Sequence, residues 1–451
     1  MTLSVVILAA GKGTRMRSRL PKVLQLLAGR PILTHVLDTA RQLNPQSIHV
    51  VIGHGAETVL GKCAAPDIDW VMQHEQLGTG HAVQQALPKI PDTHTVLVLY
   101  GDVPMISLES LRGLITAGQT APALLVATLD NPKGYGRVMR DHRTRVWGIV
   151  EEKDANDEQR AVKEVNTGLM AGPAGLFKQY LARVSNNNAQ KEYYLPDVVG
   201  LAVADGLTVI GLPGQPEEAL GVNDRHQLAV LERLLQRRLA GNLMDQGVTL
   251  IDPARIDIRG QVTCGQDVLI DANVVFEGSV VLGDGVTIGA NCFVRDCELA
   301  ANVEVLPFSH LDGAHVGEAA RIGPYARLRP GAELAADTHV GNFVEIKKSR
   351  IGEGSKVNHL SYIGDTDIGR KVNVGAGTIT CNYDGVNKHR TIIEDEAFIG
   401  SGTLLVAPVT VEEKATIGAG STLRSNAPAN KLTLSGEKQR TIDGWKRPIK
   451  K

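Results

Sequence analysis

Two glycines, Arg15 and Lys22 follow the first apolar run of the chain. The segment Gly11-Lys12-Gly13-Thr14-Arg15 comes directly after that run, and Pro21-Lys22 follows shortly afterwards. Glycine lets a backbone approach a phosphate without a Cβ in the way, and successive amides can form a nest for an anion. Arg15 and Lys22 add two positive charges that can hold a polyphosphate. A glycine-rich loop also occurs in unrelated turns, but the loop with both cations after an N-terminal strand predicts a phosphate site.

A carboxylate suited to a metal ion ends a second apolar run, in Tyr100-Gly101-Asp102. Mg²⁺ prefers oxygen ligands and keeps several waters when it binds beside a triphosphate. Taken alone, Asp102 could also cap the turn before Val103-Pro104. Beside a phosphate loop, the interpretation as a Mg²⁺ ligand is favoured.

A histidine and three cations in the C-terminal half have the chemistry for acyl transfer to an amine. His359 precedes Tyr362 by three residues, and an imidazole titrates near neutrality, as a general base should. Arg329, Lys347 and Lys348 can hold a sugar phosphate. His359 is one of 13 histidines, most of which are not catalytic, but Tyr362 and the nearby Asn382-Tyr383 favour a catalytic role.

The elements that must position the N-terminal residues alternate between strands and helices. Buried strands are predicted at Ser4–Ala10, Ser47–Ile52, Thr95–Tyr100 and Ala123–Thr128, with helices at Ile32–Leu43 and Gly80–Leu87. This alternation predicts an α/β domain with a mostly parallel sheet. Ligands of such sheets bind at the carboxyl ends of the strands, where the glycine loop and Asp102 fall.

After Ile251 the aliphatic residues recur at every sixth position. Unbroken runs are Ile270, Phe276, Leu282, Ile288 and Val294; Val316, Ile322, Leu328, Leu334, Val340 and Ile346; and Ile393, Ile399, Leu405, Val411, Ile417 and Leu423. This period predicts a solenoid in which three hexapeptides close one triangular coil. An antiparallel sandwich with chance spacing is the alternative. The period breaks between Val374 and Ile393, and such insertions often form loops on a binding face.

A charged helix predicted over residues 224–246 joins the two halves. We therefore expect domains at 1–226 and 248–451, with a helical linker at 227–247.

Composition narrows the classes of partner and the compartment. With 48 basic and 49 acidic residues the net charge is −1, which argues against nucleic acid as a partner. No stretch approaches the ~20 apolar residues of a membrane helix, and Leu3–Ala10 is too short for a signal segment. Five scattered cysteines without metal-ligand spacing favour a reduced compartment. We expect a cytoplasmic protein without a membrane partner.

With these motifs in place, the chain resembles the bacterial bifunctional N-acetylglucosamine-1-phosphate uridylyltransferase / glucosamine-1-phosphate N-acetyltransferase family over nearly all of its length. The glycine loop, Pro21-Lys22 and Tyr100-Gly101-Asp102 look like those of nucleotide-sugar pyrophosphorylases, and the hexapeptide half completes the match. The resemblance implies a Rossmann-like nucleotidyltransferase domain followed by a left-handed parallel β-helix. It also implies a homotrimer with acetyltransferase sites between subunits.

The implied reactions make UDP-N-acetylglucosamine, a precursor of peptidoglycan and lipopolysaccharide. Acetyl-CoA first acetylates glucosamine 1-phosphate. UTP then reacts with N-acetylglucosamine 1-phosphate, whose phosphate oxygen attacks the α-phosphorus in line, and pyrophosphate leaves. Positioning and charge neutralisation by Mg²⁺, Arg15 and Lys22 would suffice for this second step.

Carried over residue by residue, the resemblance implies an N-terminal site for the nucleotide sugar. Its residues would be Leu8, Ala9, Ala10, Gly11, Lys22, Gln73, Gly78, Thr79, Tyr100, Gly101, Asp102, Gly136, Glu151, Asn166 and Asn223. Gln73 and Gly78-Thr79 would contact uracil. Gly136, Glu151 and Asn166 would bind the amino sugar. Asp102 and Asn223 would bind Mg²⁺; Asp224 stands where a second Asn is expected, and a metal role for it is open but not favoured.

The same resemblance implies the C-terminal site. His359 would accept the proton, glucosamine 1-phosphate would contact Arg329, Lys347, Tyr362 and Asn373, and acetyl-CoA would contact Ala376, Asn382, Tyr383, Ser401 and Ala419. Gly436 aligns with an Arg that contacts the cofactor in the family, which leaves Lys438 and Arg440 as candidates to replace it. The basic tail over residues 446–451 could serve the cofactor's phosphates or be solvated.

Two other functions stay open. One is a pyrophosphorylase for glucose or mannose with a purely structural β-helix, against which His359 and Asn382-Tyr383 argue. The other is a non-enzymatic regulatory or scaffold subunit, as in translation-factor exchange complexes, against which Arg15, Lys22 and Asp102 argue.

Overall fold

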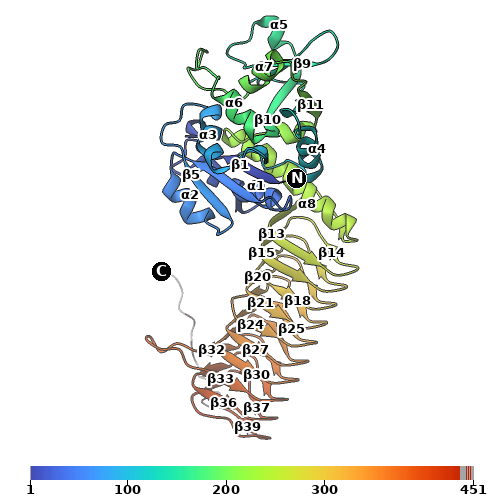
Figure 1. The fold of residues 1–451 in the computed structure, drawn as a ribbon. Coiled ribbons are helices and arrows are strands. Elements are labelled where there is room, and N and C mark those ends of the chain that lie inside the picture. The colour runs from blue at the N-terminus through green and yellow to red at the C-terminus, as the bar shows by residue number, and fades with distance from the viewer. Residues whose placement is uncertain (1, 437–442, 444, 446, 448–451) are drawn as a thin grey trace. The chain divides into compact units, whose positions relative to one another are not determined.

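The computed structural model describes residues 2–436, 443, 445 and 447, in two compact units that span residues 1–235 and 236–451 (Figure 1). The first unit is an α/β domain. The second is a column of short parallel strands.

A twisted, mostly parallel sheet forms the centre of the first unit. Its main path has the order β11-β7-β10-β6-β1-β4-β5. The strands are β1 (Leu3–Leu8), β4 (Ser47–Ile52), β5 (Ile68–Met72), β6 (Thr95–Tyr100), β7 (Ala123–Thr128), β10 (Glu164–Pro173) and β11 (Ile210–Pro213). Every pair along the path is parallel except those of β10, which lies antiparallel between β6 and β7. The hairpin of β8 (Arg137–Arg140) and β9 (Val146–Val150) pairs with β10.

Helices cover both faces of this sheet. Alternate residues of β1 explain why: Val6 and Leu8 pack toward one core and Val5 and Ile7 toward the other. The first core takes apolar residues from α3 (Thr79–Ala86), α6 (Ala174–Leu181) and α7 (Asp197–Ala204). The second takes them from α1 (Ile32–Arg41), α2 (Ala56–Cys63) and α4 (Leu108–Ala117). The remaining short elements are α5 (Asp157–Arg160), β2 (Leu26–Leu27), β3 (Arg30–Pro31), η1 (Thr14–Met16), η2 (Lys22–Leu24), η3 (Leu87–Lys89) and η4 (Pro216–Ala219).

The predicted α/β architecture is confirmed, with small shifts at element ends. Three predicted strands match β4, β6 and β7 residue for residue. β1 stops at Leu8, two residues before the predicted end, because Ala9 and Ala10 already belong to the loop. Helix α1 ends at Arg41, also two residues early. The segment predicted to join the halves is helix α8 (Arg225–Asp245), and the division between the two units falls within it.

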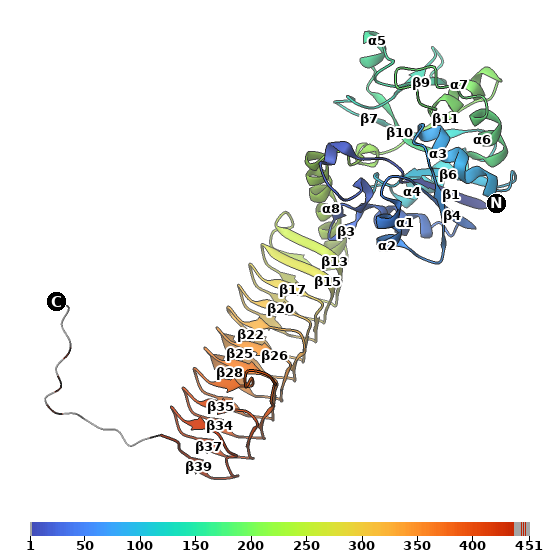
Figure 2. The ribbon, with the colours of Figure 1, turned by 90° about the vertical axis from the view of Figure 1, so that its left-hand side faces the viewer.

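The second unit is a parallel β-helix, as the six-residue period predicts (Figure 2). One sheet forms a single wall from β12 (Thr249–Leu250), β14 (Leu269–Ile270), β16 (Thr287–Ile288), β19 (Glu304–Val305), β22 (Arg321–Ile322), β25 (His339–Asn342), β28 (Lys356–His359), β31 (Asn373–Val374), β34 (Phe398–Ile399), β37 (Thr416–Ile417) and β39 (Leu432–Thr433).

The other sheet folds into the two remaining walls. Its strands are β13 (Ile256–Cys264), β15 (Val274–Leu282), β17 (Phe293–Arg295), β18 (Glu298–Leu299), β20 (His310–Asp312), β21 (Ala314–Val316), β23 (Arg327–Leu328), β24 (Ala332–Leu334), β26 (Glu345–Lys347), β27 (Ser349–Ile351), β29 (Tyr362–Gly364), β30 (Thr366–Ile368), β32 (Ile379–Cys381), β33 (Thr391–Ile393), β35 (Leu404–Val406), β36 (Val409–Val411) and β38 (Thr422–Leu423).

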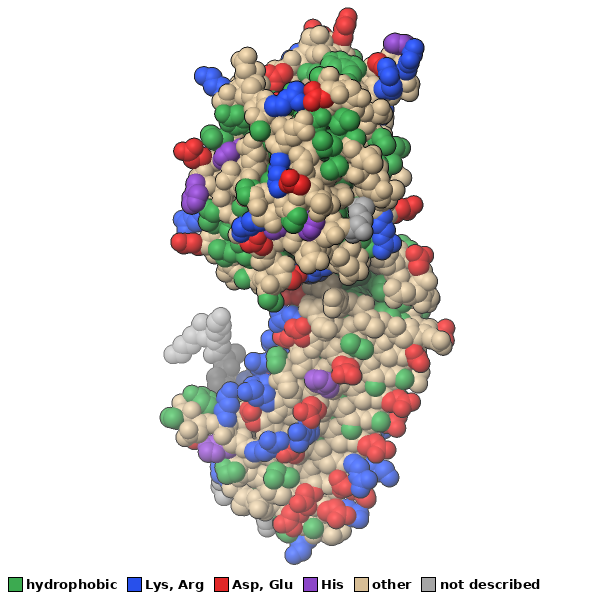
Figure 3. All heavy atoms as spheres, viewed as in Figure 1, with side chains coloured by type: hydrophobic (Ala, Val, Ile, Leu, Met, Phe, Trp, Pro, Cys, Tyr) green, Lys and Arg blue, Asp and Glu red, His purple; other side chains and the backbone are tan. Residues whose placement is uncertain are grey.

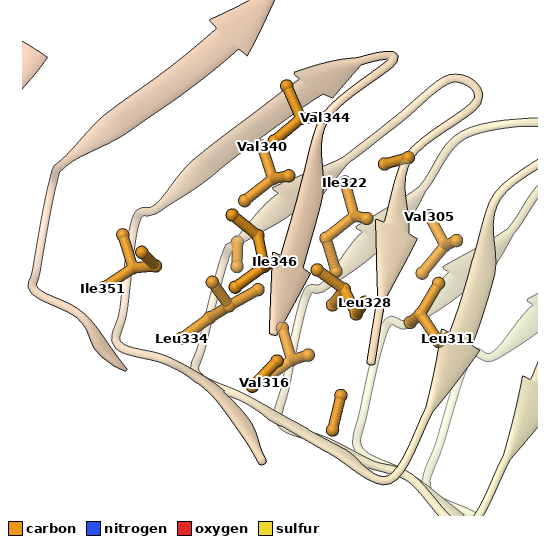
Figure 4. Packing of buried hydrophobic residues seen from close by; sticks show 14 of the residues in the cluster. Val305, Leu311, Val316, Ile322, Leu328, Leu334, Val340, Val344, Ile346 and Ile351 are labelled. Atoms are coloured by element: carbon orange, nitrogen blue, oxygen red, sulfur yellow. The ribbon is translucent and has the colours of Figure 1, made fainter. Parts of the chain in front are cut away.

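Aliphatic side chains fill the inside of the coils in vertical stacks. Val294, Leu311, Leu328, Ile346 and Ile363 are register partners in successive coils, 17 or 18 residues apart, and all are buried. Figure 4 shows these stacks pointing into the interior from all three walls. Each coil therefore buries its apolar face only against its neighbours, which is the physical basis of a solenoid.

The surface of the β-helix carries both signs of charge. Figure 3 shows Lys and Arg side chains intermixed with Asp and Glu side chains over its visible face. In the part of the chain that the structure describes, no helix is long and apolar enough to cross a membrane. All five cysteines are free thiols.

Candidate active sites

The glycine loop brings its cations to the carboxyl end of β1. Gly13 has φ +60° and stands just before η1, and a Cβ at Gly13 would lie 2.7 Å from the Cβ of Lys22. Only glycine combines this left-handed backbone with so close an approach. The loop can therefore fold against η2, which begins at Lys22, and Arg15 and Lys22 come to the same side.

Four polar side chains from distant segments meet beside this loop. The Lys22 ammonium pairs with the Asp102 carboxylate, and its Nζ lies 3.3 Å from Oδ1 of Asn223. Arg15 donates to the same Asn223 oxygen at 2.9 Å. The Lys22 and Asp102 side chains are only 16% and 13% exposed. Two cations and two oxygen ligands are thus held together at the edge of the sheet.

These side chains line a cleft of about 650 Å³. Twelve predicted site residues line it: Leu8, Ala9, Ala10, Gly11, Arg15, Lys22, Gln73, Gly78, Thr79, Tyr100, Asp102 and Asn223. Gly101 lies between two of them and donates its N–H to the Leu8 carbonyl at 2.9 Å. The Tyr100 side chain is half-buried, and desolvation, followed by the charge of Glu151, raises the pKa of its phenol.

The three residues predicted to bind the amino sugar lie together on β8, β9 and β10 and the segments beside them. Asn166 donates its N–H to the Gly136 carbonyl at 2.9 Å, and Glu151 approaches so closely that a Cβ at Gly136 would lie 2.8 Å from its Oε1. Burial, followed by the nearby charge of Asp197, raises the pKa of Glu151 to about 7. Burial and Asp154 raise the pKa of Asp197 to about 6.

The cleft also contains residues that were not predicted. They include Lys12, Gln76, Lys133, Tyr135, Thr167, Glu192, Gly221 and Gln227. Gln227 accepts a hydrogen bond from the Asn223 N–H at 2.7 Å, and Asp224 accepts one from the Gln227 N–H at 2.9 Å. Asp224 therefore orders the helix start in this structure. No spacing in the sequence links these residues, because they come from several separate loops, from strand β10 and from the start of helix α8.

The C-terminal residues gather on the outside of the β-helix. His359 is exposed at the end of β28, and its Nδ1 lies 3.0 Å from Oδ1 of Asn342, its partner one coil earlier. Arg329 pairs with Glu345 at 2.8 Å, and Glu345 is the register partner of Tyr362. Lys347 lies 3.2 Å from Asp365, which also accepts from the Asn382 amide. Asn373 stands on β31, one coil after Lys356 on β28.

One corner of the coils forms a continuous column that includes His359. The backbone N–H of Leu360, Gly377, Gly402 and Gly420 each donates to the residue before the same corner in the previous coil, namely Asn342, His359, Ala376 and Ser401. Ala376, Ser401 and Ala419, all predicted to contact acetyl-CoA, therefore follow His359 one coil at a time.

The side chains at this corner become small after His359. Phe343 and Leu360 are large and exposed, whereas the next three positions are Gly377, Gly402 and Gly420, with φ between +71° and +74°. A left-handed backbone favours glycine, and glycine leaves the corner without side chains. The surface beside the three predicted cofactor residues is therefore open.

The loop inserted after β32 brings one further cation to this site. Tyr383 and Lys388 form a bridge within the loop, and Lys388 reaches Lys347. The contact lowers the pKa of Lys388, because the neighbouring Lys347 disfavours a second positive charge. Two ammonium groups this close suit a doubly charged anion. Sequence reasoning missed Lys388, although its place in the insertion was a usable signal. Gly436 has φ +148° and open space around it; Lys438, Arg440 and all of the predicted tail except Arg447 lie outside the described residues.

The two folds and their polar clusters define a nucleotidyltransferase joined to a hexapeptide acyltransferase. Residues 5–246 match the model of the MobA-like NTP transferase domain. Residues 261–296 match the bacterial transferase hexapeptide (six repeats), and residues 390–425 match the hexapeptide repeat of succinyl-transferase.

Similar proteins cover the whole chain. The bifunctional protein GlmU of Azoarcus sp. (strain BH72) is 58% identical over 99% of this chain and 100% of its own, and that of Ralstonia nicotianae is 56% identical over 99% of both. A putative glucose-1-phosphate thymidylyltransferase from Bacillus anthracis aligns with 52% of this chain and 95% of its own at 17% identity, with a TM-score of 0.43, a likeness too weak to bear on the site. The chain belongs to the bifunctional GlmU family. The prediction of one enzyme with uridylyltransferase and acetyltransferase activities is thereby confirmed.

Proposed function

We propose that the cleft of the first unit binds UTP and N-acetylglucosamine 1-phosphate, and that the His359 column of the second unit binds acetyl-CoA and glucosamine 1-phosphate. The observation that carries the first assignment is the convergence of Lys22, Asp102, Arg15 and Asn223 in one cleft. The second assignment is supported by an exposed imidazole oriented by Asn342, by cations on neighbouring coils and the inserted loop, and by a glycine-lined corner that leaves the surface open.

The residues at the cleft fit a magnesium ion. Among the residues described, no group of three or more His, Cys, Asp or Glu side chains could hold a metal by themselves. Asp102 and Asn223 instead direct two oxygens at one cation, which here is the Lys22 ammonium. Mg²⁺ usually takes one or two protein oxygens and completes its shell with water and phosphate. When bound by Asp102 and Asn223, it would neutralise phosphate charge.

The chain's own residues do the rest of the uridylyl transfer by binding and positioning. Lys22 exchanges its carboxylate partner for a phosphate, and with Arg15 it neutralises the charge that builds up on the leaving pyrophosphate. Glu151, Gly136 and Asn166 hold the sugar so that its phosphate oxygen faces the α-phosphorus of UTP. That oxygen forms the new P–O bond as the bond to pyrophosphate breaks.

Acetyl transfer needs a base at the amine. The Asn342 oxygen can only accept a hydrogen bond, so it holds the proton on Nδ1 of His359 and leaves Nε2 free. Nε2 removes the proton of the substrate ammonium, and the amine attacks the thioester carbonyl. The C–S bond breaks and the thiol of coenzyme A leaves with a proton. The sugar phosphate is held by Lys347, Lys388, Arg329, Tyr362 and Asn373.

The open corner supports a place for acetyl-CoA along Ala376, Ser401 and Ala419, and Asn382 and Tyr383 stay predicted contacts from the start of the inserted loop. We further infer a homotrimer in the cytoplasm. Flat β-helix walls allow side-by-side packing, and five free thiols agree with a reducing compartment.

Two variants in one assay series test both assignments. In Asp102→Ala, pyrophosphate release from UTP and N-acetylglucosamine 1-phosphate should be lost while acetyl-CoA consumption with glucosamine 1-phosphate continues. His359→Ala should show the opposite pattern. Retained uridylyl transfer in Asp102→Ala would discard the metal assignment, and retained acetyl transfer in His359→Ala would discard the base.

A further inference from the structure

Among the residues that the structure describes, Arg137 is the largest side chain that is almost completely buried, at 2% exposure. A buried guanidinium is costly unless all of its charge and its donors are satisfied, so its partners show what the fold uses it for. Arg137 lies outside the cleft, at the start of β8, directly after the Gly134-Tyr135-Gly136 turn.

Its partners hold that turn from both sides. Arg137 donates to the carbonyl of Tyr135 and, from two nitrogens at 3.3 Å, to the carbonyl of Arg160 at the end of α5. Its Nη2 also forms an ion pair with Glu152 at 2.8 Å. The Glu152 carboxylate also faces the N–H of Gly134. One ion pair therefore fixes both the first and the second residue of the turn.

The same pair fixes two residues of the sugar subsite. Gly136 lies between Tyr135 and Arg137 in the chain, and Glu151 directly precedes Glu152. Strand pairing of Arg137 with Val150 brings these two segments side by side, which places Glu151 against Gly136. The Tyr135 hydroxyl lies close to the backbone N–H of Gly221, in the loop that carries Asn223. The turn is thus linked to the phosphate end of the cleft as well.

We propose that Arg137, through its ion pair with Glu152, is a positioning residue that sets the Gly136–Glu151 subsite for the amino sugar. The inference rests on the proposed role of that subsite. In this role Arg137 does not contact the substrate but holds the turn and Glu151 in register. A misplacement on the scale of 1 Å is enough to weaken a positioned contact strongly.

Paired ligands separate this role from general stability. UDP-N-acetylglucosamine differs from UDP by the sugar and by one negative charge on the terminal phosphate. The charge difference is the same in every variant, so the change between variants in the ratio of the two dissociation constants, measured by titration calorimetry, reports the sugar subsite. In Arg137→Met we expect the preference of the protein for UDP-N-acetylglucosamine over UDP to fall by at least about tenfold. The dissociation constant of UDP should stay within about twofold, and KM for N-acetylglucosamine 1-phosphate should rise more than kcat falls.

Three further variants complete the test. Glu152→Gln should reproduce the loss, because it removes the charge that orients Arg137. Arg137→Lys should recover only part of it, since a lysine cannot reach Tyr135, Arg160 and Glu152 together. Arg145→Met, at a 61% exposed position in the same hairpin, should bind both ligands as the wild type does. A UDP dissociation constant close to that of the wild type in each variant confirms that the first unit is folded.

Two results would overturn the inference: an unchanged ratio in both Arg137→Met and Glu152→Gln, or an equal loss of UDP and UDP-N-acetylglucosamine affinity. A wild type that binds UDP and UDP-N-acetylglucosamine equally would instead refute the proposed sugar subsite. If Arg137→Met fails to fold, the ratio in Glu152→Gln and Arg137→Lys decides.

Discussion

Replacing Glu151 with Gln should stabilise the first unit at alkaline pH and leave it unchanged in acid. Burial and Asp197 raise the pKa of this carboxyl from its ordinary value near 4.5 to about 7 in the folded protein. Below pH 4.5 the carboxyl is neutral in both the folded and unfolded chain. As the pH rises from 4.5 to 7 the unfolded chain ionises first, so the wild type loses stability over this window and no more above it.

The size of the loss follows from the two pKa values. A raised pKa of this extent corresponds to about 3 kcal/mol, and the partial exposure of the residue reduces it to about 1–3 kcal/mol. A glutamine has no charge to bury, so Glu151→Gln escapes this loss. We expect its free energy of unfolding to exceed that of the wild type by this amount at pH 8, and by nearly nothing at pH 4.5.

Urea unfolding followed by tryptophan fluorescence measures this difference. Trp70 and Trp147 both lie in the first unit, so the signal reports mainly that unit. Glu158→Gln, at an exposed position of α5, is the matched control and should show no pH-dependent difference. A difference between Glu151→Gln and wild type that stays constant from pH 4.5 to 8.5 would refute the reasoning, because it would mean that Glu151 ionises alike in both states.

Other perturbations should separate the two sites and test the β-helix. Asp102→Asn should lower kcat of uridylyl transfer by at least about 100-fold and leave acetyl transfer intact, as measured by pyrophosphate release; a loss below threefold would contradict a metal role. His359→Gln should lower acetyl transfer by about 10²–10⁴-fold with uridylyl transfer intact, as measured by free thiol release, and normal acetyl transfer would exclude the base. Leu328→Ala, in the filled interior of the coils, should lower the free energy of unfolding of the second unit by about 2–5 kcal/mol. Urea unfolding monitored by the loss of acetyl transfer measures this change, and the exposed control Glu318→Ala should show none.

The sequence predicts best those elements whose burial is simple. β4, β6 and β7 are central strands covered on both faces, so they are continuous apolar runs with clear ends. The β-helix follows from its period because every inward position is set by contact with the coil above and below. In both cases the local pattern of apolar residues follows directly from a regular pattern of burial.

The sugar subsite could not be derived in this way. Gly136, Glu151 and Asn166 meet only because β10 lies antiparallel between β6 and β7 and carries the β8–β9 hairpin. No periodicity of apolar residues in the sequence predicts that arrangement, and only the family resemblance identified these three residues. The same holds for Lys388, whose closeness to Lys347 depends on the path of an irregular loop, and for Arg137, which looks like any strand-edge arginine until its partners are known.

The register of the coils across the inserted loop has a consequence for how this half of the molecule can change. Thr366 pairs with Thr391, 25 residues later, whereas Arg350 pairs with Asp367 only 17 residues later. The hydrogen-bonded ladder nevertheless continues without a shift into β36. Additional residues at a corner therefore leave the strand register of the following coils unchanged. The coils can thus accommodate an insertion such as the one that carries Lys388 without losing their hydrogen-bonded register.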